Sequence, residues 1–255
     1  MAIQLFSRTL GDGPPLLILH GVFGSSDNWL TVSKLFADHF QVFLIDQRNH
    51  GRSPHTDAFS YSLLVEDLKD FAEQQGLNQF RLIGHSMGGK VAMKFASQYP
   101  EMLEKLVVVD ISPRQYNPHH ENVLAAFHSV DLQNMTSRQE ADEAMAKHIS
   151  EEDTRQFLLK NLYRDENGKF AWRINLSVLT REIGQIGEEL DPQARIETPT
   201  FFIKGGKSRY ISEMDEVQIQ KQFSNSQLIT IENAGHWVQA EQPALFAEAV
   251  NRFLE

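Results

Sequence analysis

The chain has 255 residues, enough for one domain with a large hydrophobic core. Its 34 acidic residues outnumber 24 basic ones, and the resulting net charge of −10 argues against general nucleic-acid binding. Cysteine is absent, which excludes disulfides, thiolate metal sites and a cysteine nucleophile.

The N-terminal half alternates apolar strands with helical patterns. A Gly11-Asp12-Gly13 turn between residues 3–10 and 16–20 predicts a β-hairpin. Further strands are expected at 41–46, 80–83 and 105–110, and helices at 30–40, 62–76 and 90–98. Apolar strands separated by helices predict an α/β fold with a mostly parallel sheet and helices on both faces.

After Pro113 the strand pattern stops. Helical spacing follows at 121–130, 137–149, 151–162 and 175–186, with a turn or short hairpin at 163–174. Strands return at 200–206 and 227–232, and a terminal helix begins at Pro243. We therefore expect a core formed by residues 1–113 and 191–255, with a helical cap at 114–190.

The segment Gly84-His85-Ser86-Met87-Gly88 lies between a predicted strand and a predicted helix, and it fits the Gly-x-Ser-x-Gly nucleophile elbow. A sharp strand-to-helix turn strains the serine and brings neighbouring chain close, so the flanking positions need glycine. The turn exposes the hydroxyl at the C-terminal edge of the sheet, beside a helix N-terminus that favours negative charge. Ser86 is the predicted nucleophile, and the alternative is an ordinary glycine-rich connection.

A serine nucleophile needs a base, and ten histidines are available. His236 is the best candidate, because the loop between the last predicted strand and the terminal helix opens at the same edge as the elbow. The alternative is a loop histidine packed beside Trp237. We expect the His85 side chain to leave the turn in another direction and His20 to brace a loop.

Five motifs resemble the α/β-hydrolase superfamily in their order and spacing. They are HGVFGSSDNW (20–29), DQRNHGRS (46–53), GHSMGG (84–89), VVVDISP (107–113) and AGHW (234–237). Within the superfamily, the chain resembles the small bacterial YbfF-type carboxylesterases. This resemblance implies the α/β-hydrolase fold and the hydrolysis of carboxylic esters.

The acid of the triad is less obvious from the sequence. Many hydrolases of the superfamily carry it in the loop after the strand at 200–206, where this chain has Ser208. Glu213 and Asp215 come later, in a predicted helix, and we expect them to point elsewhere. Asp110 also reaches the C-terminal edge, and the YbfF-type resemblance places the acid there. Asp215 as the acid, or Asp110 as a turn residue only, are the alternatives.

The oxyanion hole is expected at two backbone N–H groups. One belongs to Met87, after the nucleophile, and the other, by resemblance to His-Gly-x loops, to Val22, with Phe23 as the alternative. The motif with Asp46 and Arg48 is interpreted as a salt-bridged loop brace rather than a substrate contact.

The predicted cap covers the mouth of the site. Candidate substrate-binding residues are Phe23, Phe127, Phe157, Trp172 and Trp237. Taken singly, each of the cap aromatics is better explained as part of the cap's own core. Lys147, Arg155, Lys160 and Arg164 are candidates for a basic rim that holds the phosphate of a coenzyme A leaving group, with solvated helix faces as the favoured alternative.

We expect a serine hydrolase that cleaves small-molecule esters of short to medium acyl chains, with acyl-CoA thioesters as an extension. The start of the chain lacks a secretory signal and no stretch is long enough to span a bilayer, so we expect a cytoplasmic monomer or homodimer. We expect no cofactor and no metal, because the predicted serine mechanism needs neither. The adjacent His119 and His120 could suggest a metal site, but adjacent histidines on a helix face apart, so a solvated face is favoured. A cofactor-free haloperoxidase, a carbon–carbon bond hydrolase and a low-turnover ligand receptor remain alternatives.

Overall fold

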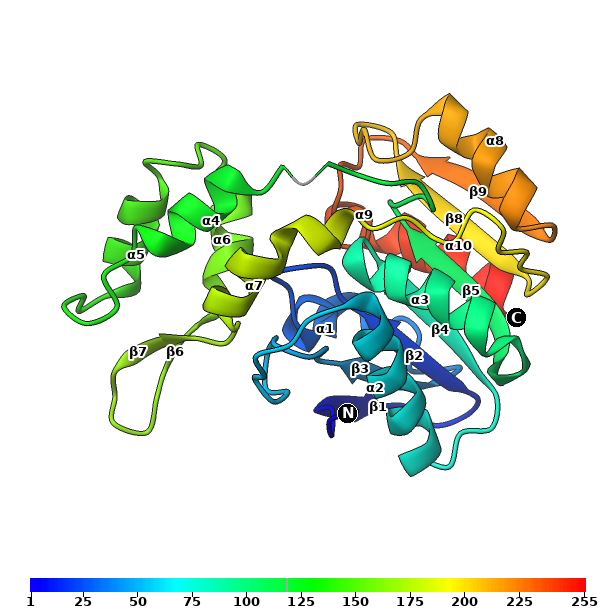
Figure 1. Cartoon of the computed structure of the whole chain (residues 1–255), viewed down its shortest axis with the longest axis horizontal. Coiled ribbons are helices and arrows are strands. Elements are labelled where there is room, and N and C mark those ends of the chain that lie inside the picture. The colour runs from blue at the N-terminus through cyan, green and yellow to red at the C-terminus, as the bar shows by residue number, and fades with distance from the viewer. Residues whose placement is uncertain (118) are drawn as a thin grey trace.

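A seven-stranded sheet forms the centre of the protein in the computed structural model, which describes residues 1–117 and 119–255 (Figure 1). The strand order is β1-β3-β2-β4-β5-β8-β9, and only the β1–β3 pair is antiparallel. The strands are β1 (Ser7–Leu10), β2 (Pro15–Leu19), β3 (Gln41–Ile45), β4 (Phe80–His85), β5 (Leu103–Val109), β8 (Thr200–Gly205) and β9 (Ser226–Ile231). The inner strands are continuous apolar runs because both faces of the sheet are covered.

The predicted hairpin at the N-terminus is wrong. β1 pairs with β3, so that Ser7 lies opposite Ile45, and β2 pairs with the other edge of β3 in parallel. Gly11 does turn the chain, with φ 71°. Glycine is needed there also because a Cβ would lie 2.3 Å from the carbonyl oxygen of Ala37. A local turn signal indicates that the chain reverses and does not determine which strand it then joins.

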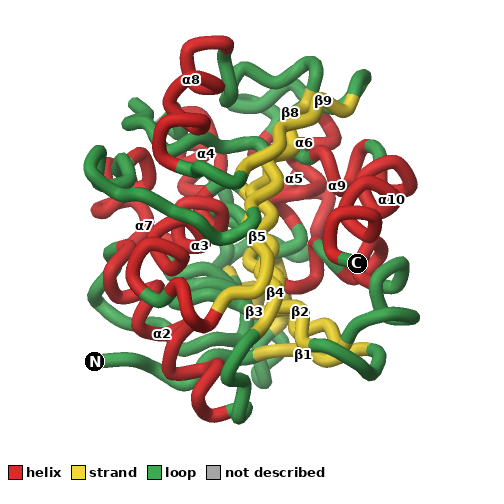
Figure 2. Tube along the Cα trace, turned by 90° about the vertical axis from the view of Figure 1, so that its right-hand side faces the viewer, coloured by secondary structure: helices red, strands yellow, loops and turns green. Residues whose placement is uncertain are grey.

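Helices cover both faces of the sheet, as the alternating pattern predicted (Figure 2). One face carries α2 (Tyr61–Gln74), α3 (Met87–Gln98) and α8 (Glu213–Gln222). The other carries α1 (Leu30–Ser33), α9 (Val238–Glu241) and α10 (Pro243–Leu254). Successive strand residues point to opposite faces, so Leu17 and Leu82 pack toward α2 and α3, whereas Ile18 and Ile83 pack toward α10.

The segment between β5 and β8 forms a group of helices beside the sheet (Figure 1). Its elements are α4 (Glu121–His128), α5 (Arg138–Met145), α6 (Glu152–Leu159), β6 (Leu162–Arg164), β7 (Phe170–Trp172) and α7 (Leu176–Glu182). β6 and β7 pair as the expected short hairpin. The Tyr61 hydroxyl donates to the Ile186 carbonyl at 2.7 Å, and the Asn175 amide donates to the Asn49 carbonyl at 2.9 Å, which joins this group to the sheet domain.

None of the helices in the described part of the chain is long and apolar enough to cross a bilayer.

Candidate active site

Ser86 occupies the turn between β4 and α3. Its backbone has φ 53° and ψ −116°, a conformation that L-residues rarely adopt. A Cβ on Gly84 would lie 2.2 Å from the carbonyl oxygen of Gly88, and a Cβ on Gly88 would lie 2.6 Å from that of Leu19. Side chains at the two flanking positions are therefore sterically excluded, as the motif predicts.

Asp110 and His236 meet at the carboxyl ends of β5 and β9. His236 Nδ1 lies 2.8 Å from Asp110 Oδ2; the Asp110 side chain is 0% exposed and that of His236 is 21% exposed. Since a carboxylate only accepts hydrogen bonds, Nδ1 carries the proton and Nε2 is left as the basic nitrogen. This is the geometry in which an aspartate fixes the tautomer of a general base.

Three further residues, which the sequence analysis did not select, support this pair. The Ser208 hydroxyl donates to Asp110 Oδ2, and the Gly205 amide donates to Oδ1 at 3.0 Å. The Tyr210 ring stacks on the His236 imidazole, with centroids 4.0 Å apart and 19° between the planes. The signal for Ser208 is its position, since it stands where the superfamily acid is usually found.

Asp215 is engaged elsewhere. Its Oδ2 accepts from the Ser212 amide at 2.7 Å in the N-terminal cap of α8, and its Oδ1 lies 2.7 Å from Arg114 Nε. The Ser112 hydroxyl donates to the same Oδ1 at 2.8 Å. The expectation that Asp215 points away from His236 is confirmed.

Two cavities meet at Ser86. The smaller, of about 250 Å³, is shared by Ser86 and His236 and has apolar walls that include Phe23, Phe157 and Trp237. The larger, of about 510 Å³, is lined in part by Ile111, Arg114, Tyr116, Ile186, Arg209 and Tyr210. Asp110 and His236 are hydrogen-bonded to each other, whereas no hydrogen bond joins Ser86 and His236 within the described residues. Ser86 and His236 instead line the same cavity.

Two of the candidate substrate-binding residues lie behind the smaller cavity rather than in its wall. Phe127 is buried and packs edge-on against Trp172, with centroids 5.0 Å apart, and against Phe23 at 5.4 Å. The assignment of Phe127 and Trp172 to the substrate wall is therefore corrected: Phe127 belongs to the hydrophobic core, and the half-buried Trp172 packs against it. Phe23, Phe157 and Trp237 do line the cavity.

The cations at the larger cavity are not those of the expected basic rim. Arg155 pairs with Asp142 at 2.9 Å, and Arg164 donates to the Gly168 carbonyl at 2.7 Å. Arg114 and Arg209 line the cavity instead. They belong to loops that are far apart in the sequence, so no local spacing groups them.

The loop that follows β2 passes beside Ser86. A Cβ on Gly21 would lie 3.2 Å from Ser86 Cβ. The Phe23 amide donates to His50 Nε2 at 3.3 Å, whereas the Val22 amide has no partner among the residues that the structure describes. Of the two alternative oxyanion donors in this loop, Val22 is thus the one whose amide is free. The Met87 amide lies in the first turn of α3, where N–H groups lack intrahelical partners.

Three buried histidines surround the site. Burial lowers the pKa of His20 to about 4 and the pKa of His50 to about 3, and it lowers the pKa of His85 well below its usual value. All three are therefore neutral at pH 7. His85 Nε2 lies 2.8 Å from the His236 carbonyl, so His85 supports the loop of the candidate base. His20 Nε2 accepts from the Gln47 amide at 3.0 Å, as expected of a loop brace.

In residues 1–117 and 119–255, no group of three or more His, Asp or Glu side chains is arranged to bind a metal ion.

Comparison with known proteins identifies the family of the chain. Residues 14–243 match the family described as alpha/beta hydrolase fold. The chain is 35% identical over 242 residues to esterase YbfF of Escherichia coli, covering 94% of this chain and 92% of that protein. It is 38% identical over 249 residues to the sn-1-specific diacylglycerol lipase ABHD11 of Mus musculus, covering 94% and 81%.

A solved structure of a marine microorganism esterase superposes with a TM-score of 0.96 at 40% identity, covering 99% of this chain and 100% of that one. The chain belongs to the α/β-hydrolase family and is a serine hydrolase of the esterase type.

Proposed function

We propose that the protein hydrolyses carboxylic esters through an acyl-enzyme, with Ser86 as nucleophile, His236 as general base and Asp110 as its orienting acid. The 2.8 Å contact between His236 Nδ1 and Asp110 Oδ2, beside a cavity that Ser86 shares, carries the proposal. The strained turn at Ser86 and the free amides of Met87 and Val22 support it.

The reaction follows from these positions. Ser86 Oγ attacks the ester carbonyl carbon while His236 Nε2 takes the hydroxyl proton, and the amides of Met87 and Val22 bind the oxyanion. The carbon–oxygen bond to the alcohol then breaks, and His236 gives its proton to the departing oxygen. Water repeats the attack with His236 as base, and the acid leaves with Ser86 restored. Asp110 stabilises the imidazolium at both stages.

The two cavities suggest how the substrate is divided. The smaller one, with aromatic walls and about 250 Å³ of space, suits an acyl chain of short to medium length. The larger one, about 510 Å³, is left for the alcohol portion.

A thioester of coenzyme A is a second candidate substrate. The observation that favours it is the pair of arginines at the larger cavity, because guanidinium groups bind phosphate well. Asp215 already neutralises Arg114, so Arg209 is the better phosphate contact.

Labelling with a fluorophosphonate tests the nucleophile. We expect rapid, single-site modification at Ser86 and turnover of p-nitrophenyl butyrate, with both lost in Ser86→Ala while its thermal unfolding stays cooperative. Retained turnover in a cleanly purified Ser86→Ala protein would remove the mechanism. A panel of p-nitrophenyl esters and acyl-CoAs then ranks the two substrate classes.

A further inference from the structure

The backbone of Phe23 is held on both sides by buried side chains. Its amide donates to His50 Nε2 at 3.3 Å, and its carbonyl accepts from Asn161 Nδ2 at 2.8 Å. His50 is 0% exposed and Asn161 is 3% exposed. Phe23 has φ 59°, a conformation that persists in an L-residue only where its surroundings maintain it. The two hydrogen bonds supply that restraint.

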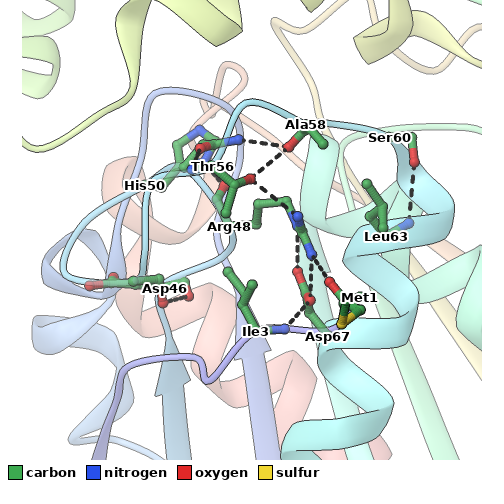
Figure 3. Close-up of polar contacts among 12 residues, drawn as sticks. Met1, Ile3, Asp46, Arg48, His50, Thr56, Ala58, Ser60, Leu63 and Asp67 are labelled. Carbon is green, nitrogen blue, oxygen red and sulfur yellow. Dashed lines mark hydrogen bonds and ion pairs between the residues drawn. The ribbon is translucent and has the colours of Figure 1, made fainter.

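His50 is itself fixed as a hydrogen-bond acceptor. Its Nδ1 lies 2.8 Å from the Arg48 carbonyl and therefore carries the proton, which leaves Nε2 free to accept from Phe23. Burial lowers the pKa of His50 to about 3, so the ring stays neutral. Arg48 Nε and Nη2 both lie 2.8 Å from the carboxylate of Asp67 in α2 (Figure 3). A continuous chain of contacts thus runs from α2 to the loop beside Ser86.

Asn161 approaches from the opposite direction. It follows α6, in the helical group assigned to the cap, and its Nδ2 also donates to the Leu158 carbonyl at 3.0 Å. If the cap moved away, the Phe23 carbonyl would lose its partner in a buried setting, which is unfavourable. The cap and the loop that follows β2 are therefore coupled through one side-chain amide.

We propose that His50 and Asn161 are positioning residues of the oxyanion hole, and that Asn161 makes its assembly depend on the seated cap. The inference rests on the proposed function. The Val22 amide lies one residue before Phe23, so holding the Phe23 backbone at its amide and its carbonyl limits where the loop can place that donor. His50 also occupies the Phe23 amide, which leaves the Val22 amide as the one presented to substrate.

Asn161→Asp tests the inference, because it keeps the shape of the side chain and removes the donor. With p-nitrophenyl butyrate we expect kcat to fall about 10- to 100-fold, with KM and the pH profile of kcat/KM unchanged. A trifluoromethyl ketone, whose adduct with Ser86 carries an oxyanion, should bind more weakly by the same factor. Binding of the corresponding alcohol, which carries neither a carbonyl group nor a negative charge, should stay the same.

His50 supplies the second arm of the test. His50→Gln keeps an acceptor for the Phe23 amide and should stay near wild type, whereas His50→Leu should lose kcat as Asn161→Asp does. Asn167→Asp, the same change at an exposed cap position, is the matched control and should be silent. If Asn161→Asp does not fold, Asn161→Ala is measured in the same way.

If the wild type is active and kcat of Asn161→Asp lies within about two-fold of the wild-type value, the inference is overturned and the proposed function is not. So would a loss of kcat with unchanged affinity for the trifluoromethyl ketone. A wild type that neither turns over the ester nor reacts with fluorophosphonate would overturn the proposed function together with the inference.

Discussion

Asp110 accepts hydrogen bonds from His236, Ser208 and the Gly205 amide while it is completely removed from water. A buried carboxylate held by three donors is fixed in position, and a fixed position is what an orienting acid needs. The same residue type at position 215 caps a helix instead. Side-chain role at this scale is decided by which donors surround the carboxylate.

Replacing Asp110 by Asn should lower kcat for p-nitrophenyl butyrate about 10⁴-fold. The Asn oxygen would still accept from the Gly205 amide, so the neutral NH₂ group would face His236 Nδ1, select the wrong tautomer and fail to stabilise the imidazolium. Asp215→Asn is the comparison: we expect near-normal turnover and a lower melting temperature, since the α8 cap and the Arg114 pair are weakened. Greater loss of turnover in Asp215→Asn than in Asp110→Asn would contradict the assignment.

The neutral, buried His50 makes folding stability depend on pH. Its pKa is about 3 in the folded state and near 6.5 when unfolded, so the unfolded chain binds one more proton between these values. The stability contribution is complete above pH 6.5 and is lost as the pH falls toward 3. When the pH falls from 7 to 5, the free energy of unfolding measured in urea should decrease by about 2 kcal/mol more for wild type than for His50→Gln. Parallel losses in the two proteins would show that His50 is protonated when folded.

At the scale of elements, α3 must satisfy two demands. Its first turn presents the Met87 amide at the site, and its next turn places Lys90 in the core at 4% exposure. The Lys90 amine donates to the Arg114 carbonyl, which ties the start of the cap connection to the helix. Burial lowers the pKa of Lys90 to about 7, so the amine is partly uncharged at neutral pH.

Lys90→Met should therefore change the pH dependence of stability. The unfolded chain keeps the lysine proton up to about pH 10.5 and the folded chain releases it near 7, so wild-type stability rises with pH over this window. When the pH rises from 7 to 9, we expect the free energy of unfolding of wild type to increase by about 2 kcal/mol relative to that of Lys90→Met. Lys94→Met, one turn further along and paired with Glu188 at 2.8 Å, is the control and should keep the wild-type pH dependence.

At the scale of the whole molecule, the candidate site lies between the sheet and the helical group that follows β5. Strand ends supply Ser86, Asp110 and His236, and the helical group supplies Phe157 to the smaller cavity. The cap also contacts the loop after β3 through Asn175 and Asn49. The shape of the smaller cavity therefore depends on how the sheet and the helical group are packed together.

Arg209→Gln tests the use of the larger cavity. If a phosphate-bearing leaving group lies there, KM for an acyl-CoA should rise about 10-fold while KM for p-nitrophenyl butyrate stays unchanged, because only the former loses a charged hydrogen bond. Arg155→Gln, which removes a cation already paired with Asp142, should affect neither substrate. If Arg155→Gln raised KM for the acyl-CoA more than Arg209→Gln does, the phosphate would bind at the surface of the helical group instead of in the larger cavity.

Much of the fold, and the turn at Ser86, could be predicted from short segments of the sequence. The glycines around Ser86, the apolar runs of the strands and the helical spacing each depend on a few neighbouring residues, because backbone conformation and steric fit are local properties. Asp110 was reached through resemblance, since nothing local distinguishes it from other carboxylates at strand ends. The expected helix at 30–40 was only partly right, because the regular helix ends at Ser33.

Other features were decided by packing alone. β1 pairs with β3 rather than with its neighbour in the sequence. Phe127 and Trp172 are not in the wall of the smaller cavity, and Arg209 lines the larger one. Each of these features depends on elements brought together from distant parts of the chain. The hydrogen bond between Asn161 and Phe23 joins residues 138 positions apart. Sequence by itself determined which segments form strands, helices and the nucleophile turn. Only the tertiary structure decided which side chains meet, because such contacts depend on the combined packing of every layer.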